Sequence, residues 1–170
     1  STEYSVGPSQ TWKLPLGSVL HPAEGNWIPV TTVGASATPM VKGSVLSLTS
    51  GQVVDVVPAA QMNNTTAVIY DVRCSDSVYA WVEVDTTTFD WELLAAPFAD
   101  GKLTGDATVL YKADKNWDPA PFSCADDKVV WLVQPSISGE KTHEASHCYV
   151  WRVGDAEGTN AVESPGRFGT

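Results

Sequence analysis

Short runs of β-branched and aromatic residues, separated by turn-forming residues, dominate this chain. Runs of this kind, bounded by Asp, Thr, Ser or Gly, are typical of β-strands. They lie at residues 45–48, 53–57, 67–72, 78–84, 91–98, 108–111, 122–124, 129–133 and 148–153. No window of helical length carries apolar residues at i, i+3, i+4 and i+7 without an interrupting Gly or Pro. The pattern therefore predicts an all-β protein.

One pattern within these runs recurs along the chain. Cys-x-Asp-x-x-x-x-Trp occurs at 74–81 and again at 124–131, which is 50 residues later. Each copy predicts a strand, a tight turn at the Asp and a return strand that carries the Trp. A fainter copy is expected at 41–48, and a second signature, Asn-Trp-x-Pro, occurs at 26–29 and 116–119. Repetition at such a period is typical of repeat architectures.

The repeat predicts how the strands assemble. A four-stranded unit cannot bury both of its faces alone, and radial stacking of such units gives a β-propeller. We therefore expect an all-β partial propeller of about three four-stranded antiparallel blades. The segments are a lead-in or edge strand over residues 1–25 and repeats over roughly 26–60, 61–113 and 114–170. A β-sandwich or a solenoid segment is the structural alternative.

Three repeats are fewer than a closed propeller needs. Propellers typically have four to eight blades, so we expect the chain to be a fragment of a larger one. The chain also begins at Ser1 rather than Met, which favours a processed N-terminus. Exposed blade edges pair readily with other chains, so self-association is expected, and two copies would supply a ring of about six blades.

The third repeat has a recognisable arrangement of residues. In 119–131, Pro and Phe precede an acidic turn and an apolar strand, and 148–151 form a later Cys-Tyr-Val-Trp strand. This arrangement resembles the TolB-like (PD40, WD40-like) propeller repeat. The Ser-Pro of that family's turn is replaced by Cys-Ala and Cys-Ser, and its Gly by Asp127 and Ser77. The resemblance implies a propeller at the cell envelope or in a secreted protein, hence an extracytoplasmic location, and says little about function.

The charge balance excludes one class of partner. The chain has 20 acidic and 10 basic residues and a net charge of −10. Nucleic-acid binding needs clustered Lys and Arg, so no nucleic-acid partner is expected. No apolar run approaches the roughly 20 residues that cross a membrane, so no membrane-spanning segment is expected. The acidity itself is also typical of proteins that are simply kept soluble by charge.

Candidate catalytic and metal chemistry is weak in this sequence. His143-Glu144-x-x-His147 has the letters of a zinc-protease motif, but that motif requires a helix. In the loop and strand expected here, the two imidazoles would lie about 13 Å apart. There is no Gly-x-Ser-x-Gly nucleophile elbow. We therefore predict no catalytic residues, no metal and no cofactor. For Cys74, Cys124 and Cys148, one disulfide with a free thiol and three buried thiols both remain open.

The candidate binding residues are Trp27, Trp117, Asp118, Asp71 and Arg73. Loops expected to share the ligand face are 25–28, 61–66 and 114–118, with 85–90 and 136–146 beside them. A loop tryptophan can stack on a sugar or aromatic ring, although a recurring Trp also suits packing between blades. Asp71 and Arg73 are expected on an innermost strand, facing the channel or forming a structural ion pair.

The function that this sequence favours is binding. We expect a non-enzymatic binding or scaffold propeller domain of the cell envelope, with a protein or carbohydrate ligand. The alternative is an accessory or gating propeller domain of a hydrolase whose catalytic domain is absent from this chain.

Overall fold

The computed structural model describes residues 11–33, 39–63 and 65–164. Within these ranges it contains 13 strands, and no helix is long and apolar enough to cross a membrane. The strands are β1 (Ser18–Leu20), β2 (Trp27–Val33), β3 (Pro39–Ser47), β4 (Val53–Val57), β5 (Ala67–Cys74), β6 (Val78–Asp85), β7 (Trp91–Ala99), β8 (Lys102–Leu103), β9 (Thr108–Ala113), β10 (Phe122–Ala125), β11 (Lys128–Val133), β12 (Ser146–Arg152) and β13 (Thr159–Ser164).

The strands form three antiparallel sheets in chain order. The first sheet is β1-β2-β3-β4 and the third is β10-β11-β12-β13. In the middle sheet, β5-β6-β7 continues into β8 at one end of β7 and into β9 along its other part. The predicted all-β class is confirmed, and the sheets are antiparallel, with four strands in the first and third sheets and five in the middle one. The sheets are open, and their identity as propeller blades stays a prediction.

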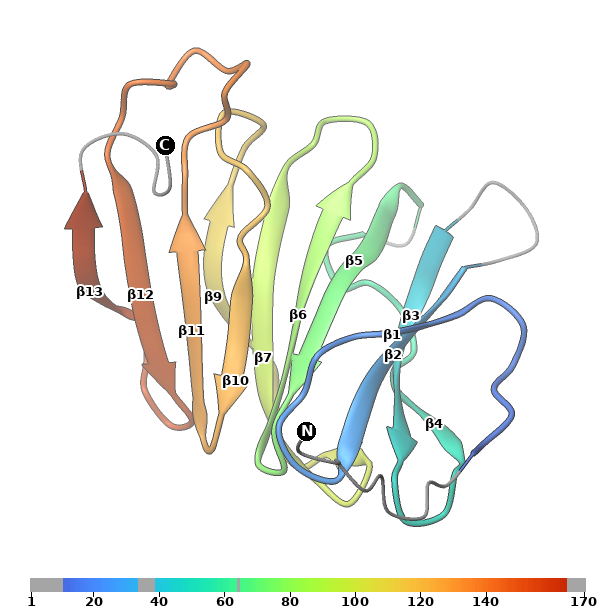
Figure 1. Cartoon of the computed structure of the whole chain (residues 1–170). Coiled ribbons are helices and arrows are strands. Elements are labelled where there is room, and N and C mark those ends of the chain that lie inside the picture. The colour runs from blue at the N-terminus through green and yellow to red at the C-terminus, as the bar shows by residue number, and fades with distance from the viewer. Residues whose placement is uncertain (1–10, 34–38, 64, 165–170) are drawn as a thin grey trace, which may run out of the picture.

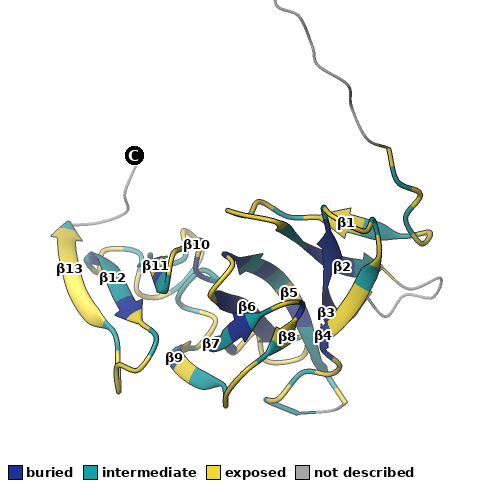
Figure 2. Cartoon of the chain, turned by 90° about the horizontal axis from the view of Figure 1, so that it is seen from below, coloured by how far each residue is buried: buried dark blue, intermediate teal, exposed yellow. Residues whose placement is uncertain are grey.

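The three sheets stand side by side, as Figure 1 shows. Seen from below, they fan out from the side on which the first strands β1, β5 and β10 lie (Figure 2). Strand β5 contacts β2 and β3 of the first sheet, and β10 contacts β5 and β6 of the middle sheet. The middle sheet is therefore covered on both faces.

Strand β6 shows why the middle sheet must be enclosed. Tyr79 and Trp81 belong to the core between the first and middle sheets. Their alternating neighbours Val78, Ala80 and Val82 belong to the core between the middle and third sheets. All five side chains are fully buried. Because successive side chains of a strand point to opposite faces, this continuous apolar run is compatible only with a sheet that is packed on both sides.

The repeated Cys-x-Asp-x-x-x-x-Trp motif has the same place in two sheets. Cys74 pairs with Tyr79 across β5 and β6, and Cys124 pairs with Val129 across β10 and β11. In both copies the Asp lies in the turn and the Trp lies on the second strand. The predicted strand–turn–strand form of both copies is confirmed, and the register repeats after 50 residues.

The predicted fainter copy of this motif is wrong. Residues 41–47 all belong to the single strand β3, which makes a hairpin with β4 around Gly51. The first sheet instead begins with the edge strand β1, inside the predicted lead-in over 1–25, of which residues 1–10 lie outside the described ranges. In the sequence, a short polar gap between apolar residues has the same appearance whether it is a turn between two strands or part of one central strand. The polar gap within β3 was therefore mistaken for a turn.

The Asn-Trp-x-Pro signature does not mark equivalent positions. Trp27 begins β2, the second strand of the first sheet, whereas Trp117 lies in the loop before β10, the first strand of the third sheet. The turn before Trp27 lies beside the β5–β6 turn, because the Asn26 amide donates to Oδ1 of Asp76 over 2.9 Å. Loop 25–28 is therefore at the opposite end of the sheets from loop 114–118, and the expectation that the two share a face is wrong.

Candidate functional site

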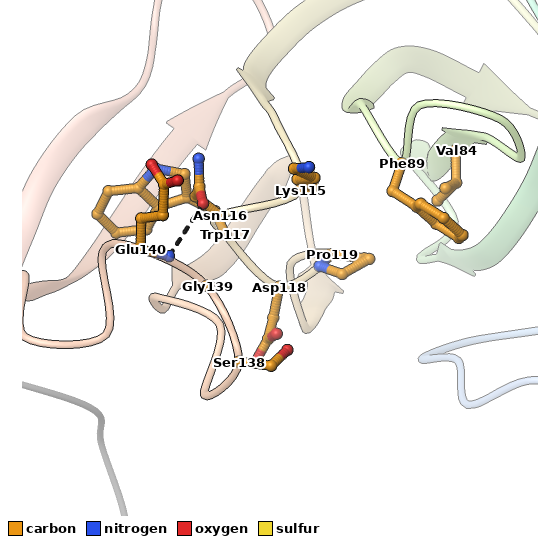
Figure 3. A pocket seen from close by; sticks show the side chains of 10 residues that line it. All are labelled: Val84, Phe89, Lys115, Asn116, Trp117, Asp118, Pro119, Ser138, Gly139 and Glu140. Carbon is orange, nitrogen blue, oxygen red and sulfur yellow. Dashed lines mark hydrogen bonds between the residues drawn. The ribbon is translucent and has the colours of Figure 1, made fainter.

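A cleft of about 500 Å³ lies between the middle and third sheets, at the end where β6 and β11 finish. Val84 and Phe89 line it from the middle sheet. Residues 115–119, in the loop between β9 and β10, and residues 138–140, in the loop between β11 and β12, complete the lining. Figure 3 shows Trp117 and Phe89 on opposite sides of this cleft. Three loops far apart in sequence thus converge on one space.

Hydrogen bonds within the β9–β10 loop and to the end of β11 fix the shape of this loop. Oδ1 of Asp114 accepts a hydrogen bond from the Asn116 amide (2.9 Å), and the Asp114 carbonyl accepts one from the Trp117 amide (3.1 Å). The Asp118 amide donates to the carbonyl of Gln134 over 2.9 Å. Side chains that cap backbone groups two residues on are the usual way to fix a tight turn. The loop is therefore tied both to itself and to the end of β11.

Asn116 fastens this loop to the β11–β12 loop. Its carbonyl accepts a hydrogen bond from the Ser136 amide (2.8 Å), and its Oδ1 accepts one from the Glu140 amide (3.2 Å; Figure 3). A Cβ added to Gly139 would lie 3.2 Å from Cα of Asn116, which is tighter than an ordinary contact. The two loops therefore form one preformed wall of the cleft.

Trp117 is both a packing residue and a wall of the cleft. It is half-buried and packs against the core between the middle and third sheets. Its carbonyl accepts a hydrogen bond from Nε1 of the buried Trp91 over 3.0 Å. Its backbone also bridges to Pro135. The two interpretations of this residue are thus compatible, because anchoring one part of a tryptophan leaves the rest available to a ligand.

Phe89 lines the cleft but was not among the candidate binding residues, although loop 85–90, which contains it, was expected beside the ligand face. It is 59% exposed and its backbone has a φ of 61°, in the left-handed region. Such a conformation is a genuine outlier for a bulky residue, and strained backbone tends to cluster at functional sites. The only signal for it in the sequence is a single aromatic residue in a run of Thr and Asp. This signal does not recur along the chain, so the repeat pattern could not identify it.

Asp85 holds the Phe89 loop in shape. The Asp85 carbonyl accepts a hydrogen bond from the Phe89 amide (2.8 Å), and its Oδ1 accepts bonds from the Thr87 amide and hydroxyl (2.8 and 2.6 Å). These bonds, led by the Thr87 hydroxyl, hold the pKa of Asp85 well below its ordinary value. The carboxylate is therefore charged at neutral pH and fixes the loop that presents Phe89.

The polar groups of the cleft are of both signs. Lys115, Asp118 and Glu140 all line it, and the Asp118 side chain points toward Ser138 (Figure 3). Pockets with aromatic walls and a few placed polar groups are typical of sites for small ligands. The arrangement suits a molecule with an apolar face and hydroxyl or amide groups at its edge.

Trp27, the other aromatic candidate, is not brought into this cleft. Its ring packs edge-to-face against Phe98, with centroids 6.0 Å apart and an interplanar angle of 88°. It also covers Gly101, where a Cβ would come within 3.1 Å of the ring. Trp27 therefore fills the interface of the first and middle sheets, away from Trp117.

Asp71 and Arg73 do pair, in a cluster that includes His21. Oδ1 of Asp71 accepts a hydrogen bond from the Arg73 guanidinium and lies 3.0 Å from Nδ1 of His21. The Arg73 guanidinium also lies over the Phe122 ring, 5.6 Å from its centroid. The cluster thus joins β5 to the first and third sheets and does not line the cleft.

The hydrogen bonds of this cluster follow the order of those in a catalytic triad, but the hydroxyl at the end of the series is not accessible to a substrate. Nε2 of His21 lies 2.7 Å from Oγ1 of Thr31, on the opposite side of the ring from Asp71. The Asp–His–hydroxyl order resembles that of a nucleophile triad. Thr31, however, is fully buried, so a substrate cannot reach its hydroxyl. The relay is a buried hydrogen-bond network that ties the first sheet to the middle sheet.

The three cysteines are all free thiols, so the alternative with a disulfide is wrong, and the alternative of three buried thiols holds for two of them. Cys74 and Cys124 are buried and Cys148 is partly exposed. Sγ of Cys74 donates to the Trp27 carbonyl over 3.3 Å, and burial raises the pKa of this thiol to about 12. The cysteines of the repeated motif therefore pack between sheets as neutral thiols.

The two histidines of the zinc-like motif lie in different elements, one in a loop and one on a strand. His143 is exposed in the β11–β12 loop, and His147 lies on β12 with Nδ1 3.5 Å from a carboxylate oxygen of Glu163. Among the described residues, no group of three His, Cys, Asp or Glu side chains is placed to hold a metal ion.

Comparison of the chain with protein-family models, curated proteins and solved structures finds no match.

Proposed function

We propose that this chain is a non-enzymatic binding or scaffold domain of the cell envelope, built from propeller-type repeats, whose ligand site is the cleft between Trp117 and Phe89. The observation that supports this proposal most directly is that two aromatic residues, Trp117 and Phe89, line one preformed cleft together with Asp118, Lys115 and Glu140.

A carbohydrate is the ligand class that fits this cleft best. A volume of about 500 Å³ is within the usual range for small-ligand sites. The C–H face of a pyranose ring matches an aromatic wall, because both are apolar and flat. Its hydroxyls match the carboxylates of Asp118 and Glu140 and the ammonium group of Lys115, which together offer acceptors and donors.

The architecture supports the propeller part of the proposal. The three sheets fan out from the side of their first strands (Figure 2), and loops of the middle and third sheets line one cleft at one end of the sheets. In stacked-sheet folds the loops that converge in this way commonly carry the binding residues, because a rigid scaffold positions them.

The test is titration of the protein with a panel of oligosaccharides, followed by tryptophan fluorescence. We expect Phe89→Ala to weaken binding about tenfold or more, since loss of about 1.4 kcal/mol is tenfold in Kd. Trp117→Ala should abolish binding, and circular dichroism must show that it still folds, because Trp117 also packs on the core.

The matched control is Tyr70→Ala. Tyr70 is an exposed aromatic (52%) on β5, outside the cleft, so its removal should leave Kd unchanged. The proposal is refuted if no oligosaccharide binds, or if a bound one is insensitive to both Phe89→Ala and Trp117→Ala.

A further inference from the structure

Two tyrosines from neighbouring sheets meet between the middle and third sheets. Tyr111 lies on β9 and Tyr149 on β12, and their ring centroids are 5.3 Å apart with an interplanar angle of 45°. Both residues are partly exposed and pack against the core between these two sheets. The cleft is lined by other residues. The tyrosine pair is therefore a feature separate from the proposed ligand site.

The hydroxyl groups of the pair interact with each other. Burial first, and then the charge and the hydrogen bond of the Tyr149 hydroxyl, raise the pKa of Tyr111 to about 12. The Tyr111 phenol is therefore neutral at physiological pH. The ring carbons beside a phenol hydroxyl are the atoms that couple when two tyrosyl radicals combine. Because the two hydroxyls are hydrogen-bonded, these carbons of the two rings lie close together.

Packing alone does not require a tyrosine at position 149. Tyr149 pairs with Trp131 across β12 and β11, and in the middle sheet Leu94 pairs with Trp81 across β7 and β6. The two tryptophans are the equivalent residues of the repeated motif, 50 positions apart. Leu94 is buried and fills its place without a hydroxyl. The third sheet thus has a phenol where the same unit in the middle sheet has an apolar side chain.

A tryptophan stacks on each of the two tyrosines. The ring centroids of Trp91 and Tyr111 are 5.8 Å apart, and those of Trp131 and Tyr149 are 5.4 Å apart. Both tryptophans are buried, so the partly exposed members of this row of four rings are the tyrosines. A tyrosine that releases its proton is easier to oxidise at neutral pH than a tryptophan. An electron lost from either tryptophan is therefore replaced from the tyrosine stacked on it.

We propose that Tyr111 and Tyr149 are the site of a dityrosine cross-link within one chain, formed when a haem peroxidase with hydrogen peroxide oxidises this protein. Each phenol loses one electron and its hydroxyl proton. The two radicals combine in a bond between the ring carbons beside their oxygens, and the hydrogen on each of these carbons moves to the oxygen. Hydrogen peroxide takes up the two electrons and the two protons. Two tyrosines and one peroxide thus give one dityrosine and two water molecules.

The cross-link joins the sheets on the side away from their main strand contacts. Those contacts come from β10 with β5 and β6, and from β11 with β6. The sheets fan out from their first strands, so β9 and β12 lie further out (Figure 2). Positions 111 and 149 are 38 apart in the chain (149 − 111). A covalent bond across this span restricts the unfolded chain as a disulfide does, and should raise the Tm by about 10 °C.

The experiment treats the full chain with hydrogen peroxide and a haem peroxidase, in dilute solution so that coupling between molecules is rare. We expect dityrosine fluorescence in the monomer band of a denaturing gel. Trypsin releases Tyr111 in peptide 103–112 and Tyr149 in peptide 142–152, because a Lys precedes each peptide and a Lys or Arg ends it. The mass spectrum should contain these two peptides joined, with the loss of two hydrogen atoms.

Two conservative variants distinguish this pair from general oxidation of the chain. Tyr111→Phe and Tyr149→Phe each keep the ring and remove the hydroxyl, so both should keep the circular dichroism of the unmodified chain. Each should lose the joined peptides and the rise in Tm. The matched control is Tyr70→Phe, because Tyr70 is an exposed tyrosine (52%) on β5, outside the pair. The yield of the cross-link should be unchanged in this control.

Two results would overturn the proposal. One is a monomer without the joined peptides in a sample whose Tyr70 or tryptophans have been oxidised. The other is dityrosine that persists within the monomer of both Tyr111→Phe and Tyr149→Phe. Neither measurement involves a ligand of the cleft, so the result does not depend on the proposed binding function.

Discussion

The packing of the first sheet on the middle sheet depends on one close approach between a glycine and a tyrosine. The hydroxyl of Tyr79 is buried and donates a hydrogen bond to the Ser44 carbonyl over 3.1 Å. A Cβ added to the neighbouring Gly43 would lie 2.6 Å from that hydroxyl oxygen. The hydroxyl and the missing side chain therefore occupy the same space, and their substitutions should be coupled.

The single substitutions should each destabilise the protein. Tyr79→Phe removes one buried neutral hydrogen bond, which costs about 1 kcal/mol and up to about 2 if the Ser44 carbonyl is left unpaired. Gly43→Ala forces the hydroxyl away, and overpacking of this kind costs about 1–3 kcal/mol. Alanine also lowers the conformational entropy of the unfolded chain, which offsets about 0.5 kcal/mol of this destabilisation.

The double variant should be more stable than the sum of the two changes predicts. Without the hydroxyl, the closest atoms to a Cβ at Gly43 are Cγ1 of Val72 at 3.4 Å and Cε1 of residue 79 at 3.5 Å, which are ordinary contacts. Gly43→Ala should then cost almost nothing in the Tyr79→Phe background. The coupling free energy should be about 1–2 kcal/mol.

Urea unfolding followed by tryptophan fluorescence gives the free energy of unfolding of the unmodified protein, the two single variants and the double variant. Tyr70→Phe, at a half-exposed position on β5, is the control and should change the free energy of unfolding by less than about 0.5 kcal/mol. If Gly43→Ala costs the same with Tyr79 and with Phe at that position, the steric reasoning about this interface is refuted.

Two further predictions concern titratable groups. Burial raises the pKa of Glu83 above its ordinary value of 4.5, so the folded state holds its proton to higher pH than the unfolded state. The free energy of unfolding should therefore fall as pH rises from about 4.5 through the folded pKa, and Glu83→Gln should flatten that dependence; an unchanged slope in urea titrations at stepped pH would contradict it. In dilute native protein, a thiol reagent should modify the partly exposed Cys148 first, and the buried thiols of β5 and β10 only after urea unfolds the chain. Equal rates for all three thiols would contradict the packing described here.

The sequence determined the local structure of this protein. Alternating and continuous apolar runs predicted the strands, and the Cys-x-Asp-x-x-x-x-Trp motif predicted the same hairpin in the middle and third sheets. The continuous apolar run of β6, from Val78 to Val82, also required a sheet buried on both faces. These features depend on side-chain alternation over a few residues, which the order of residues alone contains.

The tertiary structure alone decided which ends and loops meet. It put Trp27 and Trp117 at opposite ends of the sheets although both follow an Asn, and it put Phe89 across the cleft from Trp117. It also brought His21 beside Asp71, 50 residues away in the chain. The physical reason is that strand order and sheet packing set the place of a loop, and both arise from contacts between distant residues that no local pattern records.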